Sequence, residues 1–482
     1  MRILFILTLT SLIRHFESVV LELAERGHSI RIATPGRRTN WPLPHAIVSH
    51  PRISQVTCPE ERGDEWAKAA PNFRLLVDYA RYLEAPFEKA EKLRARALLE
   101  FVRHLTERQQ RHVIARCPSC EARIQDDDLG RMLLTGKEPG TSTFKQILGL
   151  LEQSIPTDPG RDAFLKAEHP DVLLITPLVD LGSDQPDWVK SAKGLAIPVG
   201  FPVFSWDNFT TKGIIHEHPD RIFVWNERQK QEAVELHGAN SEDIFVTGAP
   251  RFDAFFSMAR KRSREVFCAK FNLDPAKPLL AYLCSSDFVA GGEVDFVATW
   301  IQEIRREPSL AECNILVRPH PRTAREWDAL DAGQWRNVAV SRSKIANADQ
   351  LLYDTLYHSA AVVGLNTSAQ IEAGILGKPV CTILAPGFEK GQQGALHFRY
   401  LLREGGGFVN LARDFEEHRQ QLADAVAGRY DPQHIRDFIE RFIRPAGLST
   451  PATPLLVEAI EHLAPATGLS TVKRWLKSAS LR

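Results

Sequence analysis

Short apolar runs that alternate with helix-compatible segments are the feature of this sequence that most limits its possible folds. The chain opens with an apolar run at 2–7, an amphipathic segment near 16–26 that ends at Gly27, and a second apolar run at 29–34. Glycine is favoured just after a helix, and a strand–helix–strand unit places two parallel strands in one sheet. The sequence therefore predicts an α/β protein built on doubly wound parallel sheets.

The chain length of 482 residues exceeds what one hydrophobic core usually serves, so we expect two domains. A polar, basic stretch near 259–265 separates two series of predicted strands. The residues from about 64 to 166 show helical periodicity instead, which predicts a helical insertion. A last helix-like segment is expected to pack back across the domain junction. The predicted parts are a first domain at 1–262, a second domain at 263–465 and a basic tail at 466–482.

The charge balance and the cysteine content narrow the functional classes. Lys plus Arg equals Asp plus Glu at 60 each, so no global positive field attracts DNA or RNA. Seven scattered cysteines fit a reducing compartment better than a disulfide framework. No apolar segment has the length of a membrane span, and the first apolar run is too short for a signal peptide. We therefore expect a cytoplasmic protein without a nucleic-acid partner.

The basic tail, GLSTVKRWLKSASLR, is weakly amphipathic. This pattern is typical either of a loosely ordered terminus or of a peripheral contact with an anionic membrane surface. One short basic helix binds lipid only weakly, which favours the loosely ordered terminus.

Candidate binding residues follow the predicted strand at 314–317, in the segment NILVRPHPR. Ligands of open parallel sheets bind at the carboxyl ends of the strands. Here the strand is followed by Arg318, His320 and Arg322, held in a turn stiffened by two prolines. Arg forms bidentate contacts with phosphate, and His donates to a leaving oxygen. The pattern favours a phosphate or diphosphate site over an exposed turn with incidental charges.

A second candidate segment follows the predicted strand at 361–364. Asn366, Thr367 and Ser368 precede a helix, where free backbone amides accept an anionic group. Glu372, one turn into that helix, is placed either to bind a ribose hydroxyl or to serve as a cap. Ser285 and Ser286 lie at the end of the predicted strand at 277–286. Their hydroxyls are placed either to contact a phosphate or to form part of a plain turn.

The RPHP turn, together with the Asn-Thr-Ser segment before a helix, resembles the HP and S motifs of GT-B enzymes that use cytidine-activated donors. These enzymes are capsule Kdo transferases, bacterial sialyl- and polysialyltransferases, and CDP-glycerol glycerophosphotransferases. The likeness covers roughly 277–384. It implies two facing Rossmann-like domains and a nucleotide-activated donor, with a glycan or glycolipid of the cell envelope as acceptor.

The resemblance also implies roles for individual residues. His320 would contact the donor phosphate and assist the leaving nucleotide, while Asn366, Thr367 and Ser368 would hold phosphate. The segment IEAGILGKPV looks like the ribose-binding stretch of retaining GT-B transferases, but Gly364 replaces the earlier acid of that pattern. This difference favours an inverting mechanism.

An inverting transferase of this kind uses a carboxylate of the first domain as general base. Two segments that follow predicted strands offer one: PLVDLGSDQPDW with Asp180, Asp184 and Asp187, and FSWDNFTTKG with Asp207. Asp180 and Asp207 lie nearest the ends of their strands and are the leading candidates. Each of the four acids is also a candidate helix cap.

Metal and cofactor signals are weak. Cys117 and Cys120 form one CxxC without a second pair, and the run 126–128 of aspartates has no preceding strand. We expect structural cysteines, no catalytic metal and no cofactor, with the nucleotide-activated donor as a substrate.

Two other functional classes remain open. The first is a non-hydrolysing sugar-nucleotide epimerase, which shares the fold but usually has Gly-Gly where this chain has Asn366 to Ser368. The second is a non-catalytic scaffold with a degenerate nucleotide site, because a fold alone does not fix an activity.

Overall fold

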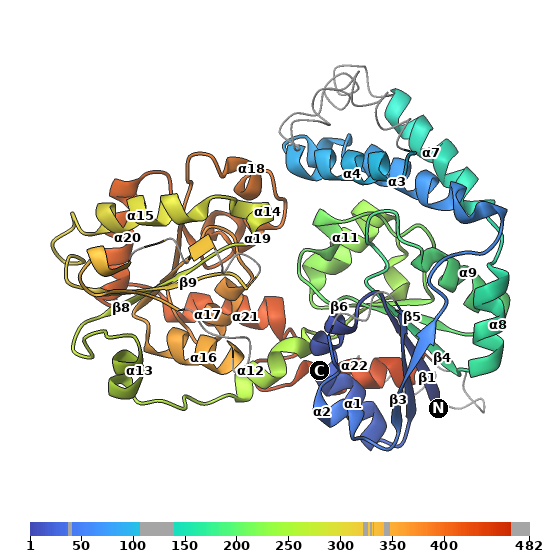
Figure 1. Ribbon diagram of the computed structural model, residues 1–482, viewed down its shortest axis with the longest axis horizontal. Coiled ribbons are helices and arrows are strands. Elements are labelled where there is room, and N and C mark those ends of the chain that lie inside the picture. The colour runs from blue at the N-terminus through green and yellow to red at the C-terminus, as the bar shows by residue number, and fades with distance from the viewer. Residues whose placement is uncertain are drawn as a thin grey trace. The chain divides into compact units, whose positions relative to one another are not determined.

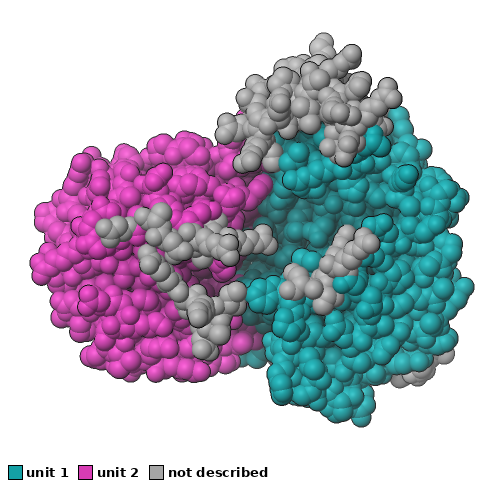
Figure 2. Space-filling model, in the orientation of Figure 1, with its two compact units in different colours: residues 1–85, 93–251, 442–482 teal, residues 86–92, 252–441 magenta. Residues whose placement is uncertain are grey.

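A computed structural model describes residues 1–36, 41–106, 139–321, 326–327, 330, 332–341 and 348–463. The chain forms two compact units (Figures 1 and 2). Unit 1 contains residues 1–85, 93–251 and the described residues from 442 onward, and unit 2 contains 86–92 and 252–441. Each of the described helices is too short or too polar to span a bilayer.

Unit 1 is built on a seven-stranded parallel sheet with the order β3-β2-β1-β4-β5-β6-β7. The chain order reverses between β1 and β4, and ligands of such sheets bind near this reversal, beyond the carboxyl ends of the strands. The strands are β1 (Arg2–Leu7), β2 (Ser29–Pro35), β3 (Ile53–Cys58), β4 (Val172–Thr176), β5 (Val199–Pro202), β6 (Arg221–Val224) and β7 (Ile244–Val246).

Alternate residues of the unit 1 strands face two separate cores, as expected for a sheet covered by helices on both faces. Ile3 and Phe5 pack with α1 and α22, whereas Leu4 and Ile6 pack with α8, α9 and α11. The helices of unit 1 outside the insertion are η1 (Thr10–His15), α1 (Glu17–Glu25), α2 (His45–Val48), α8 (Pro159–Glu168), α9 (Gln185–Gly194), α10 (Asn208–Thr211), α11 (Glu227–His237), η6 (Ser241–Asp243), η7 (Pro250–Phe252) and α22 (Ala452–Glu461).

Helices occupy the described part of the predicted insertion, although residues 86–92 group with unit 2 and not with unit 1. Helix α3 packs against α7, and both lie near α4 (Figure 1). The insertion contains η3 (Glu65–Ala67), α3 (Ala69–Arg81), η4 (Ala85–Phe87), α4 (Glu91–Arg103) and α7 (Pro139–Gln153). The CxxC pair and the aspartate run noted in the sequence lie outside the described residues, as does the basic tail.

Unit 2 contains a six-stranded parallel sheet with the order β10-β9-β8-β11-β12-β13, which is the strand order of a Rossmann fold. Its strands are β8 (Leu279–Leu283), β9 (Asn314–Arg318), β10 (Val338–Val340), β11 (Ala361–Val363), β12 (Val380–Ile383) and β13 (Asn410–Ala412).

The helices of unit 2 also cover both faces of its sheet. One core joins Leu280 and Tyr282 to α15 and α20, and the other joins Leu279 to α13 and α16. The helices are α12 (Asp253–Ser257), α13 (Arg264–Lys270), α14 (Asp287–Ala290), α15 (Glu293–Ile304), η9 (Ala332–Gln334), α16 (Ala348–His358), α17 (Ala369–Ile375), α18 (Glu389–Gln392), α19 (Phe398–Leu401), η10 (Arg403–Gly405), α20 (Phe415–Val426) and α21 (Pro432–Ile443).

The last described helix belongs to unit 1, whereas the sequence placed residues up to 465 in the second domain. Helix α22 lies beside α1 (Figure 1), and its Leu456 and Ile460 join the core of β1. Glu461 accepts hydrogen bonds from Arg26 at 2.9 Å and pairs with His28 at 2.8 Å. The expected return of the last helix-like segment accounts for the difference, because the apolar face of α22 covers one face of the β1 sheet and so belongs to unit 1.

Replacing Leu456 with alanine is expected to lower the free energy of unfolding of unit 1 by about 2–5 kcal/mol, because a buried leucine leaves a cavity. Leu456 is 1% exposed. Val48→Ala, at a position 66% exposed, is the control and should change stability little. Chemical denaturation measures both, and equal effects would show that α22 does not complete the core.

Candidate functional site

Three strand ends of unit 2 meet because β8 pairs with both β9 and β11. Leu283 is opposite Arg318, and Tyr282 is opposite Val363. The turns that follow these strands contact one another: the Cys284 amide donates to the Arg318 carbonyl at 3.0 Å. Predicted residues from three separate segments are thereby placed at one edge of the sheet.

Arg318 supplies a cation at this edge. Its guanidinium donates to the Ala348 carbonyl at 2.8 Å, which uses one of five N–H donors. Burial lowers the pKa of Arg318, while the charges of Asp349 and Glu372 raise it. Arginine remains charged under these conditions. Glu372 is 7% exposed and close enough to interact with Arg318, so two residues predicted from different segments lie in one site.

His320 follows β9 by two residues and is partly exposed, as is Pro319. Ser286 is also partly exposed, directly before α14, whereas Ser285 is buried. Arg322, the third predicted cation of this turn, lies outside the described residues. The described part of the turn therefore offers one imidazole and one guanidinium.

Asn366 is buried and holds the turn after β11 in place. Its amide donates to Ser285 Oγ at 3.3 Å, and its side-chain Nδ2 donates to the Gly391 carbonyl at 3.0 Å. These contacts give Asn366 a part in building the turn. Thr367 and Ser368 are partly exposed at the same strand end.

Gln370 was not singled out in the sequence, yet it fixes the same turn from within α17. Its Oε1 accepts from the Thr367 amide at 3.4 Å, and its Nε2 donates to the Gly364 carbonyl at 3.0 Å. A Cβ at Gly364 would lie 3.0 Å from the Leu283 carbonyl oxygen and 3.1 Å from Thr367 Cγ2. An acid at position 364, as in the retaining pattern, therefore requires the neighbouring atoms to shift.

Glu293 is a second residue that the sequence analysis missed. Its carboxylate is buried behind the turn after β8, where it accepts from the Ser285 amide at 2.8 Å and the Tyr282 hydroxyl at 3.0 Å. Burial raises the pKa of Glu293 to about 7, against the opposing effect of these hydrogen bonds. The local sequence GGEVDF gives no sign of burial, because an acid at a helix start is usually exposed.

In unit 1 the turns after β1, β4 and β5 also lie together, since β4 pairs with both other strands. Asp180, after β4, accepts a 2.6 Å ion pair from Lys212. Lys212 Nζ lies 5.7 Å from the centre of the Phe204 ring, and the His15 ring lies 5.1 Å from the same ring. The Asp180 side chain is 38% exposed, so its carboxylate is accessible to solvent.

Asp207, the other leading candidate for a general base, is bonded within its own turn. Ser205 Oγ donates to Oδ1 at 2.5 Å, and Thr211 Oγ1 donates to Oδ2 at 3.1 Å. Both carboxylate oxygens are thus bonded to side chains of the same turn, and neither accepts from a backbone amide at the start of α10. The Asp207 carboxylate is therefore occupied within its own turn, whereas that of Asp180 is accessible beside Lys212.

His15 is a titratable group that the sequence analysis did not select. It is the last residue of η1, the short helix that follows β1. Its Nδ1 has no hydrogen-bond partner among the described residues. Burial, together with the charges of Arg251 and Arg14, lowers the pKa of His15 well below its ordinary value. The imidazole is therefore neutral at neutral pH.

Helix α3 of the insertion holds the turns that carry Asp180 and Lys212. Asp78 accepts from the amides of Gly182 at 2.8 Å and Ile214 at 2.9 Å. Tyr82, the residue after α3, donates to the Lys212 carbonyl at 2.6 Å. The insertion thus fixes the backbone on both sides of the Asp180–Lys212 pair.

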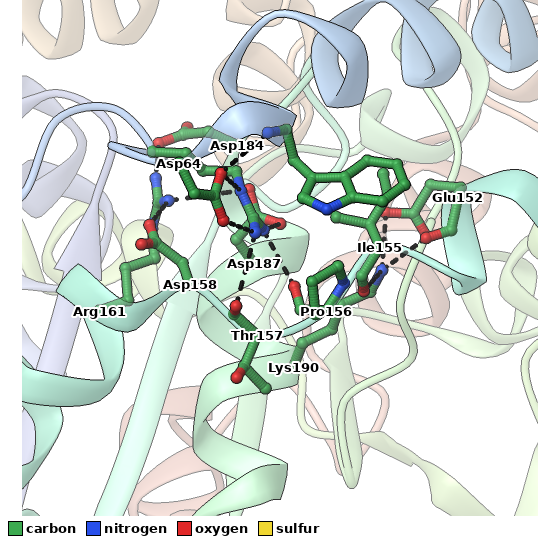
Figure 3. Close-up of polar contacts among 12 residues, drawn as sticks. Asp64, Glu152, Ile155, Pro156, Thr157, Asp158, Arg161, Asp184, Asp187 and Lys190 are labelled. Atoms are coloured by element: carbon green, nitrogen blue, oxygen red, sulfur yellow. Dashed lines mark hydrogen bonds and ion pairs between the residues drawn. The ribbon is translucent and has the colours of Figure 1, made fainter.

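A buried ionic network anchors the insertion to the rest of unit 1, and Figure 3 shows the part of it that contains Glu152, Asp187 and Arg161. Arg74 of α3 donates to Asp187 at 2.7 Å and to Glu152 at 2.9 Å. Arg62 pairs with Asp187 at 2.8 Å, and Lys190 pairs with Glu152 at 3.2 Å. The network joins α3, the end of α7 and α9, and it also includes Arg161 with its partners Asp158 and Asp184.

Asp184 and Asp187 therefore belong to this network. Burial by itself raises the pKa of Asp187, but hydrogen bonds and charges from Arg74, Arg161 and Arg62 outweigh it and hold the pKa below its ordinary value. A carboxylate bound in this way is a structural anion rather than a proton acceptor.

Within the described chain, no group of three or more His, Cys, Asp or Glu side chains is arranged to hold a metal ion.

No protein-family model and no curated protein sequence matches this chain. Solved structures do match it along nearly its whole length. A UDP-GlcNAc 2-epimerase from Methanocaldococcus jannaschii has 13% identity and a TM-score of 0.51, covering 96% of this chain and 100% of that chain. A glycosyltransferase from Rickettsia africae ESF-5 has 11% identity and a TM-score of 0.52, covering 97% and 99%. A putative UDP-N-acetylglucosamine 2-epimerase from Listeria monocytogenes has 13% identity and a TM-score of 0.51, covering 96% of each.

At these identities the likeness shows the fold alone. Together with the two parallel sheets, it confirms the predicted α/β architecture of the GT-B type, with two Rossmann-like units. The comparison does not separate transferases from epimerases, because the TM-scores of the two classes are nearly equal.

Asp187→Asn is expected to lower the free energy of unfolding of unit 1 by about 3–5 kcal/mol, because it leaves buried arginines without a counter-charge. Since the pKa of Asp187 is lowered in the folded chain, its contribution is present at neutral pH and is lost as the pH falls through that pKa. The difference in the free energy of unfolding between the variant and the wild type should therefore disappear at acidic pH.

The matched control is Glu100→Gln, which removes an exposed ion pair with Arg103. Such pairs contribute about 0–1 kcal/mol. Chemical denaturation at several pH values measures both variants, and a loss no larger for Asp187→Asn than for Glu100→Gln would contradict the anchoring role.

Proposed function

We propose that this chain is a metal-independent, inverting glycosyltransferase that takes a sugar or polyol phosphate from a cytidine-activated nucleotide donor. Unit 2 binds the donor, and unit 1 binds an acceptor hydroxyl of a cell-envelope polysaccharide or glycolipid. The observation that carries the proposal is the convergence of Ser285, Arg318 and Glu372 at adjacent strand ends of unit 2, with His320 in the turn after β9. The cytidine donor and the envelope acceptor rest on the motif resemblance.

The donor side fits an anionic ligand with hydroxyl groups. Arg318 is a half-buried cation with further N–H donors beyond the one bound to Ala348, and such a group binds phosphate oxygens bidentately. His320 donates a hydrogen bond or a proton to the leaving phosphate oxygen. Glu372 accepts hydrogen bonds from ribose hydroxyls.

The acceptor side supplies the base. Asp180 takes the proton of the acceptor hydroxyl, and the oxygen attacks the donor carbon or phosphorus. The bond to the nucleotide phosphate breaks, and the leaving phosphate carries away the bonding electrons. Lys212 keeps the Asp180 carboxylate oriented through its ion pair. Arg318 and His320 stabilise the departing charge.

An epimerase is the second candidate, because two of the matched structures are named as UDP-GlcNAc 2-epimerases, each with a TM-score of 0.51 to this chain. The turn from Asn366 to Ser368, in place of the usual Gly-Gly, favours the transferase. A calorimetric and thermal-shift screen against CMP, CDP, UMP, UDP and GDP tests the donor class. Selective cytidine binding supports the proposal, selective UDP binding with an isomerised sugar product indicates the epimerase, and no nucleotide binding contradicts both.

His320→Ala is expected to lower the rate of nucleotide release and transfer by about 10²–10⁴-fold, the range for losing a general acid or proton donor. The fold should be unchanged, because His320 is partly exposed. His45→Ala, at an exposed position of unit 1, is the control. Normal turnover in a folded His320→Ala variant would exclude the assigned role.

Asp180→Asn is expected to lower kcat by about 10²–10⁴-fold without changing the affinity for donor nucleotide, because the base acts on the acceptor. Asp207→Asn is the matched comparison. It should lower thermal stability, because it weakens the turn before α10, and keep most of the activity. Steady-state kinetics and thermal unfolding separate the two, and the reverse result would make Asp207 the base.

A further inference from the structure

Glu293 is a buried carboxylate of unit 2 that no step of the proposed transfer uses. The side chain belongs to the first residue of α15 and is 4% exposed. The two groups that donate hydrogen bonds to it, the Ser285 amide at 2.8 Å and the Tyr282 hydroxyl at 3.0 Å, are both neutral. Glutamate is almost never fully buried unless it is paired with a cation, so this position calls for an explanation beyond packing.

The contact with Ser285 is the first in a series of hydrogen bonds between two turns. Ser285 Oγ accepts from the Asn366 amide at 3.3 Å, and Asn366 Nδ2 donates to the Gly391 carbonyl at 3.0 Å. Ser285 and Asn366 are both nearly inaccessible to solvent. Glu293 thus fixes the turn after β8, and through Ser285 it reaches the turn after β11.

We propose that Glu293 is a positioning residue for the donor nucleotide, which acts by holding the Ser285 turn and, through it, the turn from Gly364 to Ser368. The inference rests on the proposed function, since these turns form the donor side of unit 2. Glu293 does not contact the donor itself, because both of its oxygens are bonded to the protein.

The charge of Glu293 couples this position to pH. The titratable groups that face it are Tyr282 and Cys284, whose pKa values burial raises well above their ordinary values, so both are neutral near pH 7. Farther along α15, Trp300 contacts His418, whose pKa burial lowers to about 3. The Glu293 carboxyl therefore ionises near pH 7 among neutral neighbours, and its negative charge disfavours a nearby phosphate.

The test uses the full chain with Glu293→Gln and Glu293→Ala, titrated with CDP and with UDP by calorimetry between about pH 6 and pH 8. Glutamine keeps both contacts, since Oε1 accepts from the Ser285 amide and Nε2 donates to Tyr282. We expect Glu293→Ala to weaken nucleotide binding about tenfold and Glu293→Gln to bind like the wild type at low pH. Wild-type affinity should fall with rising pH more steeply than that of Glu293→Gln. His320 is present in all three proteins, so the difference isolates Glu293.

Asp354→Ala is the control for a general loss of stability in unit 2. Asp354 is fully buried and accepts from Arg262 at 2.8 Å and from the Lys261 amide at 3.0 Å. This variant should lower the melting temperature and leave nucleotide affinity unchanged.

Thermal unfolding without ligand gives an independent check. The folded chain holds the Glu293 proton more tightly than the unfolded chain, because the pKa rises from 4.5 to about 7 on folding. Raising the pH from 4.5 to about 7 therefore destabilises the wild type and not Glu293→Gln. The melting temperature of the variant should rise relative to that of the wild type over this range. Hydrogen exchange of the amides at 284–286 and 365–368 should be faster in Glu293→Ala alone.

A folded Glu293→Ala variant with wild-type nucleotide affinity would overturn the inference, as would an equal loss of affinity in Asp354→Ala. Wild-type protein that binds CDP or UDP, with all Glu293 variants unaffected, rejects the positioning role and leaves the proposed function intact. Failure of the wild type to bind either nucleotide rejects the proposed function, and the inference with it.

Discussion

The turns that carry Asp180 and Lys212 in unit 1 depend on the buried ionic network around Arg74 and Asp187. Parallel strands bring the turns after β1, β4 and β5 to one edge, but pairing alone leaves those turns without support. Helix α3 provides the support through Asp78 and Tyr82, and α3 is held in turn by Arg74. The ion pairs thus link α3 to α7 and α9, and a shift of any one of these helices would leave a buried charge unpaired.

The two units hold the turns at their strand ends through different kinds of contact. In unit 1, permanent charges fix the scaffold and leave Asp180 accessible beside Lys212. In unit 2, the turns are joined mainly by neutral hydrogen bonds through Ser285, Asn366 and Gln370. Arg318 keeps further N–H donors beyond the one bound to Ala348, so its charge is available to an anionic ligand.

The alternation of apolar runs predicted both parallel sheets and the helical insertion. The spacing of apolar residues and the residue types at turns depend only on neighbouring positions in the sequence, so they can be read without the structure. The rule that side chains after parallel strands meet predicted that Ser285 and Arg318 are neighbours, and Glu372 was predicted from its place one turn into the helix after the next strand. Glu293 and Gln370 were not found, since a Glu or Gln in a first helical turn looks like a solvent-exposed residue unless the tertiary contacts are known. For the same reason the sequence predicts Asp187 as a cap or a base, although three arginines distant in sequence surround it in the structure. The place of α22 in unit 1 depends on a contact across more than 400 residues.

The return of α22 to unit 1 has a consequence for biosynthesis. The core that contains Ile3 and Phe5 lacks Leu456, Val457 and Ile460 until nearly the whole described chain has left the ribosome. Unit 2, in contrast, takes nearly all of its residues from the continuous stretch 252–441, which emerges earlier. The domain whose chain begins first is therefore the last to complete its packing, and its exposed sheet face is the part of the nascent protein most in need of protection from aggregation.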